Sequence, residues 1–339
     1  MERVVIVSAR VGAGHDGAAH QLARRCRDRG MAADVVDVLD MLPGPLGRLL
    51  CDGYRRQLTV APRTWDWLLA GLDRPALAAA ARWFARLAGR GLTEVLDDSV
   101  AFVMSTYPLA THAIAHLKAR GRVIAPLAVY LTDPSVHRLC VSPLADLTIA
   151  PNDTAARQAH DLGARRTIVA RPLVGNGFRP VATAGERDHL RAELGLPPDR
   201  PLALIVAGSW GVGEVEETAA DVAASGQAEP VVVCGENDAL RARLTDAGYR
   251  HVFGWVTAMP ELMRACDVVV QNAGGLTTSE ALASGLPVVT YRCLPGHGRS
   301  NAAVLDADGT VPWLRTPADL APGLARALAT GRLPVETAS

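Results

Sequence analysis

Short apolar runs alternate along the whole chain with segments whose apolar residues recur at helical spacing. Strands are predicted at Arg3–Ser8, Ala33–Val38, Val100–Met104, Val123–Leu131, Leu147–Ala150, Leu202–Val206, Val231–Cys234, His251–Phe253, Val268–Val270 and Val288–Tyr291. Helices are predicted at His15–Arg29, Pro75–Ala88, Leu109–Arg120, Asp153–Leu162, Val215–Ala224, Asp238–Ala247, Pro260–Ala265, Thr278–Ala283 and Pro317–Ala329. This alternation is typical of α/β proteins with parallel sheets.

Each half of the chain opens with a strand that runs into a glycine-rich turn. The first turn is Val11-Gly12-Ala13-Gly14-His15, and the second is Gly208-Ser209-Trp210-Gly211-Val212-Gly213. Two such openings in 339 residues predict two Rossmann-like domains, which bind ligands beyond the C-terminal ends of their strands. We expect an N-terminal domain at 1–170, a linker at 171–186, a C-terminal domain at 187–330 and a tail at 331–339.

A third glycine-rich turn follows the apolar run that ends at Val270. It contains Asn272, Gly274, Gly275 and Thr277, and a helix is predicted from its hydroxyl residues to Ala283. Glycines allow a ligand to approach the backbone, and a helix N-terminus offers unpaired N–H groups to an anion. The turn therefore suits a phosphate or pyrophosphate, although an ordinary strand–turn–helix connection would have the same pattern.

Composition excludes several other classes of function. The 35 lysines and arginines balance 35 aspartates and glutamates, so no bulk charge favours nucleic acid. Six scattered cysteines without a CxxC pair argue against a zinc site or a disulfide framework. The sequence contains neither a signal peptide nor an apolar run long enough to span a bilayer, so we expect a cytoplasmic protein.

Short motifs spread along the chain together carry a resemblance to one known family. The resemblance is carried by Gly12-Ala13-Gly14-His15, Ser105-Thr106-Tyr107-Pro108, Thr132-Asp133 with His137, Gly208-Ser209-Trp210-Gly211, Gly254-Trp255-Val256 with Met259, Gly274-Gly275 through Glu280, and Pro295-Gly296 with Asn301. The chain is similar to GT-B glycosyltransferases of the group that contains monogalactosyldiacylglycerol synthase, diacylglycerol glucosyltransferases and MurG-type enzymes. The resemblance implies two Rossmann-like domains that face each other across a cleft.

The resemblance also implies a nucleotide-sugar co-substrate, most often linked to UDP, on the C-terminal domain. Its donor-binding residues would be Gly208, Ser209, Trp210, Gly211, Trp255, Val256, Met259, Asn272, Gly274, Gly275, Thr277 and Glu280. Glu280 would bind the ribose hydroxyls, and the glycine-rich turn would hold the diphosphate. Helix dipoles and amides commonly stabilise the pyrophosphate in such enzymes, so neither a cofactor nor an obligatory metal is expected.

Transfer with inversion requires a base that removes the proton of the acceptor hydroxyl. His15 is the first candidate, because its place at a helix N-terminus favours the neutral imidazole that a base needs. Asp133, before Pro134 at the predicted end of a strand, is the second candidate. It would be the base itself or would orient a catalytic histidine, and a plain turn-forming aspartate fits nearly as well. Gly14 and His137 are candidates for contact with the acceptor or the sugar.

The segment after the last predicted strand departs from the family pattern. Lipid-glycosylating relatives usually carry a Gln-Glu pair there, whereas this chain has His297-Gly298 followed by Arg299. Recognition of the sugar or the acceptor is assigned to this segment. Because the Gln-Glu pair is absent from it, the identity of the sugar stays open. Its candidate residues are Pro295, Gly296, His297, Arg299 and Asn301. Arg138-Leu139-Cys140 also replaces a tryptophan that relatives often carry after the position of His137.

Residues 48–90 combine aromatic and basic side chains. The aromatic residues are Tyr54, Trp65, Trp67, Trp83 and Phe84, and the arginines are Arg48, Arg55, Arg56, Arg63, Arg82, Arg86 and Arg90. This combination suits peripheral contact with an anionic membrane on the cytoplasmic side. Aromatic residues packed inside the N-terminal domain, with arginine stems around them, explain the pattern as well.

Several functions remain open from the sequence. The first is an inverting glycosyltransferase that uses a UDP-sugar and a diacylglycerol or polyprenyl lipid. A variant of it acts on a soluble specialised metabolite. A nucleotide-sugar 2-epimerase shares the expected fold and donor site but needs no acceptor, and a non-catalytic nucleotide-sugar-binding protein is the remaining class.

Overall fold

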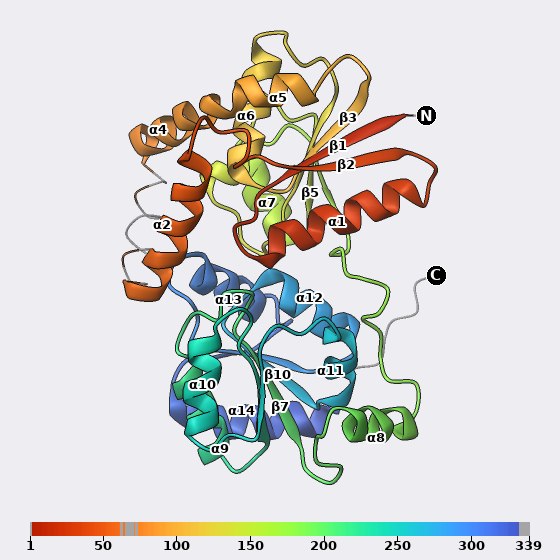
Figure 1. The fold of residues 1–339 in the computed structure, drawn as a ribbon, viewed down its shortest axis with the longest axis vertical. Helices are drawn as coiled ribbons and strands as arrows, with labels where there is room; N and C mark the ends of the chain where they lie inside the picture. Colours follow the sequence, from red (N-terminus) through yellow and green to blue (C-terminus); the bar gives the residue numbers. More distant parts are fainter. Residues whose placement is uncertain (1, 62–63, 65–70, 72–73, 332–339) are drawn as a thin grey trace. The chain divides into compact units, whose positions relative to one another are not determined.

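The computed structural model describes residues 2–61, 64, 71 and 74–331 (Figure 1). It divides into two compact units, Met1–Leu173 and Val174–Ser339. Arg63, Trp65 and Trp67 of the aromatic and basic segment lie outside the described residues, as does most of the expected tail. In the described part of the chain, no helix has the length and apolar character needed to cross a membrane.

The first unit is built on a six-stranded parallel sheet in the order β2-β1-β3-β4-β5-β6. Its strands are β1 (Arg3–Ser8), β2 (Ala32–Asp37), β3 (Val100–Ser105), β4 (Leu127–Tyr130), β5 (Leu147–Ala150) and β6 (Thr167–Val169). The strand order reverses between β1 and β3, which is the place where such sheets bind ligands.

The helices of the first unit connect its strands along the chain, several of them in succession between β2 and β3. They are α1 (Ala13–Arg27), α2 (Leu46–Val60), α4 (Pro75–Ala85), α5 (Gly89–Val95), α6 (Pro108–Ala119) and α7 (Asp153–Asp161). Val4 and Ile6 of β1 pack against Ala18, Ala19 and Leu22 of α1. Burial of these apolar side chains fixes α1 on the sheet, so the first turn of α1 lies at the C-terminal end of β1.

The second unit holds another six-stranded parallel sheet, in the order β12-β11-β10-β7-β8-β9. Its strands are β7 (Leu202–Val206), β8 (Glu229–Val233), β9 (His251–Phe253), β10 (Val268–Gln271), β11 (Val288–Tyr291) and β12 (Trp313–Leu314). Its helices are α8 (Ala184–Glu193), α9 (Val215–Ala224), α10 (Asp238–Asp246), α11 (Met259–Ala265), α12 (Gly275–Ala283), α13 (His297–Ala307) and α14 (Pro317–Thr330). Here the order reverses between β7 and β10, which hydrogen-bond to each other.

Alternate side chains of β7 pack into the hydrophobic cores on the two faces of this sheet. Ala203 and Ile205 belong to one buried cluster, and Leu202, Leu204 and Val206 belong to the other. Strands buried on both faces read as continuous apolar runs, which explains why the run at β7 carries no polar position.

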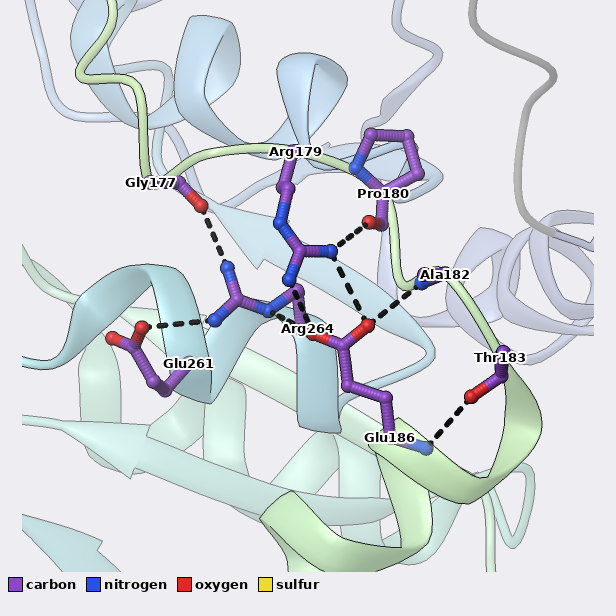
Figure 2. A network of polar contacts seen from close by, with 8 residues as sticks. All are labelled: Gly177, Arg179, Pro180, Ala182, Thr183, Glu186, Glu261 and Arg264. Carbon is purple, nitrogen blue, oxygen red and sulfur yellow. Dashed lines mark hydrogen bonds and ion pairs between the residues drawn. The ribbon is translucent and has the colours of Figure 1, made fainter.

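Residues 177–186, which were expected to be part of the linker, are held by polar contacts within the second unit (Figure 2). Arg264 of α11 donates to the carbonyl oxygen of Gly177 at 2.6 Å and forms an ion pair with Glu186 at 3.2 Å. Arg179 donates to Glu186 at 2.7 Å, which holds the pKa of this carboxyl group below its usual value. Thr183 caps α8 by accepting from the Glu186 amide at 3.1 Å.

The structure corrects the expected elements at several places. The predicted strand from Val123 is reduced to β4, which begins only after Pro126 because proline has no amide hydrogen for the ladder. The predicted helix at 278–283 begins three residues earlier, at Gly275. Elements that the pattern did not predict are α2, α5, β6, α8, α13 and β12.

Candidate functional site

Loops that follow three neighbouring strands of the second unit meet at Asn272, directly after β10. The Asn272 side chain donates from Nδ2 to the carbonyl oxygen of Val212, in the loop after β7, at 3.2 Å. The carbonyl oxygen of Asn272 accepts from the amide of Leu294, in the loop after β11, at 3.1 Å. Asn272 therefore links the glycine-rich turn to both flanking loops, as expected at the reversal of strand order.

Glycines permit the close approach of the loops after β7 and β8. A Cβ atom on Gly211 would lie 2.2 Å from the carbonyl oxygen of Cys234, and one on Gly235 would lie 2.4 Å from that of Ser209. Both glycines have positive φ angles, of 57° and 60°. Asn237 adds to this contact by donating to the carbonyl oxygen of Gly211 at 2.8 Å. Gly208, Ser209 and Trp210 are thus held in a defined turn.

The turn between β10 and α12 has an unusual backbone. Ala273 has a φ angle of 81°, which is uncommon for a residue with a Cβ atom. Gly274 is the N-cap of α12 and provides no side chain to bind the first amides of the helix. Such an N-terminus has free N–H donors and the positive end of the helix dipole, so the turn suits a diphosphate.

Asn301 of α13 supports the turn between β10 and α12. Its side chain is 0% exposed and donates to the carbonyl oxygen of Ala273 at 3.2 Å. The sequence suggested recognition of sugar or acceptor, whereas this burial gives Asn301 a supporting position in the structure.

Glu280 lies in the second turn of α12, which begins at Gly275. Burial raises its pKa to about 8. Within the described part of the chain, its carboxyl group has neither a hydrogen bond nor an ion pair. A partly buried carboxyl group that lacks a protein partner is suited to bind hydroxyl groups of a ligand. Thr277 is half-buried in the first turn of the same helix.

Trp255 follows β9 and is 57% exposed. Its neighbour Val256 and the first residue of α11, Met259, pack against the core instead. The exposed indole is thus the side chain of this group that offers a flat surface to a base, while Val256 and Met259 position the backbone.

The segment after β11 leads into the start of α13. Gly296, the N-cap, has a φ angle of 78°, which only glycine adopts without strain. His297 is the first residue of the helix, and Arg299 is exposed in the same turn. Pro295 precedes the cap. These residues follow Leu294 directly, so they adjoin the loop that contacts Asn272.

In the first unit, His15 lies in the first turn of α1 beside the loops that follow β3 and β4. Its Nδ1 atom is 2.7 Å from the carbonyl oxygen of Thr106 and 3.2 Å from the hydroxyl of Thr132. Its ring contacts Tyr107 edge-on, with 5.0 Å between the ring centroids. His15 thus lies where the strand order of the first sheet reverses, and Gly14 precedes it in the same helical turn.

Asp133 follows Thr132 in the loop after β4. Its negative charge contributes to the raised pKa of Tyr54 in α2, although burial of the phenol is the larger cause. Asp133, Tyr54 and Tyr107 therefore belong to one neighbourhood with His15. His137 lies outside the helices, immediately before a short 3₁₀ turn at Arg138–Cys140.

The candidate residues therefore form two groups, one in each unit. Thr106, Thr132, Cys234 and Asn237 contact these groups but were not assigned roles from sequence. The Cys234-Gly235-Glu236-Asn237 turn carried a signal, since it has a glycine and a helix-capping residue directly after a strand. In the described residues, no group of three or more His, Cys, Asp or Glu side chains is arranged to hold a metal ion.

Comparison with known proteins gives related sequences over most of the chain. Residues 210–330 match the family model described as "Glycosyl transferases group 1". The processive diacylglycerol beta-glucosyltransferases of Bacillus thuringiensis (strain Al Hakam) and Bacillus cereus (strain AH820) are each 27% identical over 328 residues. Each match covers 92% of this chain and 82% of the relative.

Solved structures share the fold at low sequence identity. MurG of Acinetobacter baumannii has a TM-score of 0.55 and 15% identity, with 96% of this chain and 90% of that chain covered. HepE of Anabaena, solved in complex with UDP and glucose, has a TM-score of 0.56 and 17% identity, with 97% and 89% covered. The two six-stranded parallel sheets of this chain agree with the similarity of fold. The chain is therefore a glycosyltransferase with the GT-B fold.

Proposed function

We propose that the chain transfers a hexose from a UDP-sugar to a hydroxyl group of a diacylglycerol-type lipid, with inversion at the anomeric carbon. The observation that carries the donor assignment is the junction of the loops after β7, β10 and β11 at Asn272, beside the N-terminus of α12. The uncapped amides there suit a diphosphate, and Glu280 suits the ribose hydroxyls. HepE, which shares the fold, was solved with UDP.

The first unit supplies the base in this proposal. A carbonyl oxygen only accepts hydrogen bonds, so the contact with Thr106 requires a proton on Nδ1 of His15. In the neutral ring, Nε2 then carries the lone pair. As the acceptor oxygen forms its bond to the anomeric carbon, Nε2 takes the hydroxyl proton. The bond between that carbon and the β-phosphate oxygen breaks, and UDP leaves with the electron pair. Asp133 remains the second candidate for this base.

UDP leaves as an anion, so stabilisation of the diphosphate is as important as the base. The free amides of α12 and the positive end of its dipole provide this stabilisation without a proton transfer. The proposal needs no obligatory metal. Pro295, Gly296, His297 and Arg299 adjoin this helix terminus through Leu294, which favours a role for them in sugar recognition.

A lipid acceptor is supported by the named activity of the Bacillus relatives and by an exposed apolar surface on the first unit. We define this surface by Leu49 and Val60 of α2 and Leu77 and Trp83 of α4, which are 61%, 74%, 46% and 60% exposed. Exposed arginines in α2, at the two ends of α4 and in α5 are Arg48, Arg56, Arg74, Arg86 and Arg90. Apolar side chains among arginines suit the interface of an anionic bilayer, and we propose peripheral binding there on the cytoplasmic side.

The direct test is an assay with purified protein, a panel of UDP-hexoses and vesicles that contain diacylglycerol and phosphatidylglycerol. The proposal predicts one or more glycosylated diacylglycerols by mass spectrometry, with the anomeric configuration opposite to that of the donor. Isomerisation of a UDP-sugar without acceptor would establish an epimerase instead. Transfer only to a soluble hydroxyl compound would overturn the lipid assignment while leaving the donor assignment intact.

A further inference from the structure

Arg292, the residue after β11, is held by two acidic side chains near the loop after β7. Its guanidinium donates to Asp221 of α9 from Nε at 3.0 Å and from Nη2 at 2.8 Å. A third contact, from Nη1, joins Glu214, which precedes α9. Tyr291 donates its phenolic hydrogen to the same oxygen of Asp221 at 2.7 Å. The arginine and Asp221 are mostly shielded from solvent, which strengthens their attraction.

The backbone at Arg292 is strained. Its φ angle is 45°, and Ala273 is the other non-glycine residue with a positive φ in the described part of the chain. A residue with a Cβ atom adopts this region at a cost of free energy, and it does so where its surroundings hold it there. Three hydrogen bonds to Asp221 and Glu214 provide that restraint for Arg292. The two strained residues follow adjacent strands, β11 and β10.

Arg292 is the first residue of the segment 292–294, which contacts the loop after β10. Leu294 donates its amide to the carbonyl oxygen of Asn272 at 3.1 Å. A Cβ atom on Gly213 would lie 3.2 Å from the Leu294 side chain and 3.1 Å from Asn272. Glu214, one of the partners of Arg292, directly follows Gly213. The ion pairs of Arg292 are therefore linked to the junction at Asn272 along two stretches of the chain. Glu214 is two residues from Val212, and Arg292 is two residues from Leu294.

We propose that Arg292 is a positioning residue for the nucleotide-sugar donor. Its ion pairs with Asp221 and Glu214 hold the backbone turn that places Leu294 against Asn272 and directs residues 295–297 toward the start of α13. This inference rests on the proposed function, because it assumes that the donor binds at these loops. Arg292 acts through the loops and does not touch the donor.

The test compares Arg292→Ala and Asp221→Asn with Arg243→Ala. Arg243 of α10 also pairs with an acidic residue of α9, Glu216, at 2.8 Å, but it does not join the loop after β11. Arg292→Ala and Asp221→Asn are expected to weaken UDP binding by calorimetry and to raise the donor KM by about tenfold or more. The KM for the acceptor should stay within about twofold in both variants, because the residues proposed to act on the acceptor lie in the first unit, away from both substitutions. Arg243→Ala should leave all of these values near those of the wild type.

Arg292→Lys retains the charge and should recover part of the donor affinity. A second readout is independent of ligand: amide hydrogen exchange of residues 293–297 should accelerate in Arg292→Ala and not in Arg243→Ala. Unchanged UDP affinity together with unchanged exchange in Arg292→Ala would overturn the inference. So would an equal rise of donor and acceptor KM, since that would indicate general loss of structure. Accelerated exchange in a protein whose wild type binds no UDP would instead contradict the proposed function.

Discussion

The Nδ1 atom of His15 lies 2.7 Å from the main-chain carbonyl oxygen of Thr106. This contact joins the first turn of α1 to the loop after β3, across the point where the strand order of the first sheet reverses. Because the acceptor belongs to the backbone, substitution of the Thr106 side chain does not remove it. The tautomer with its proton on Nδ1 is therefore set by the fold of the first unit.

His15→Ala should lower kcat by about 10²- to 10⁴-fold, which is the usual contribution of a general base. The dissociation constant for UDP should change little, because the loops proposed to bind the donor lie in the second unit. Single-turnover kinetics and calorimetry on the same preparation separate these two effects. Loss of UDP binding in His15→Ala would make the histidine a phosphate-binding or structural residue.

The melting temperature should depend on pH through Glu280. Its pKa is about 8 in the folded chain, against an ordinary value of 4.5. The folded chain therefore holds a proton that the unfolded chain loses between these pH values, so this group's contribution to stability falls as pH rises from about 4.5 to 8. Glu280→Gln stays neutral and removes this loss.

Relative to the wild type, Glu280→Gln should thus gain about 4 kcal/mol of stability between pH 5 and pH 8.5, because each pH unit across this range changes the stability of the wild type by about 1.4 kcal/mol. In differential scanning fluorimetry this gain corresponds to an increase of about 8–16 °C in the difference between the two melting temperatures. A difference that is the same at both pH values would show that Glu280 is ionised in the folded chain at neutral pH.

Gly235→Ala should disrupt the contact between the loops after β7 and β8. The new Cβ would lie 2.4 Å from the carbonyl oxygen of Ser209 and 2.5 Å from that of Gly208, so the backbone must move. We expect a loss of stability of about 3 kcal/mol or more together with weaker UDP binding. Gly226→Ala is the matched control, because its φ angle is 66° but no atom lies within 4 Å of the new Cβ.

The control isolates the cost of a positive φ angle, about 1–2 kcal/mol. Its UDP affinity should equal that of the wild type. Equal effects of the two substitutions, measured by thermal unfolding and calorimetry, would mean that the loops after β7 and β8 adjust freely and do not define the donor site.

Trp83→Ala and Leu49→Glu should reduce binding to phosphatidylglycerol vesicles in a flotation assay. Both remove apolar area from the exposed surface on α2 and α4, and Leu49→Glu adds a charge that an anionic bilayer repels. Ile124→Glu is the control, since Ile124 is 84% exposed but lies outside those helices. If Ile124→Glu were as damaging as Leu49→Glu, the binding would depend on net charge and not on this surface.

The sequence alone was enough to predict the two parallel α/β sheets. Strands such as β1, β7 and β11 were predicted with their observed bounds, because strands buried on both faces form uninterrupted apolar runs between turn signals. The edge strand β12 has only two residues, Trp313–Leu314, which is too short for any periodic signal. Helix α13 was missed because its first turn contains glycine and serine, which locally disfavour a helix.

The glycine-rich turn after β10 was predicted in kind but not in detail. Glycine at 274 and 275 predicted a turn that leads into a helix, yet the helix begins at Gly275 and not at the hydroxyl residues that follow. Thr278 and Ser279 hydrogen-bond back to the carbonyl oxygens of the preceding turn instead of capping the helix. The strained φ angles of Ala273 and Arg292 had no sequence signal, because tertiary contacts impose them on residues that do not favour them.

The central claim is that the loops around α12 bind the nucleotide diphosphate of a sugar donor and that Glu280 contributes to this site. Isothermal titration of UDP into the wild type and into Glu280→Ala tests it without knowledge of the acceptor or the sugar. The account predicts saturable binding by the wild type and a dissociation constant that is larger by about tenfold or more in Glu280→Ala. Absence of UDP binding by the wild type, or equal affinity of the two proteins, would contradict it.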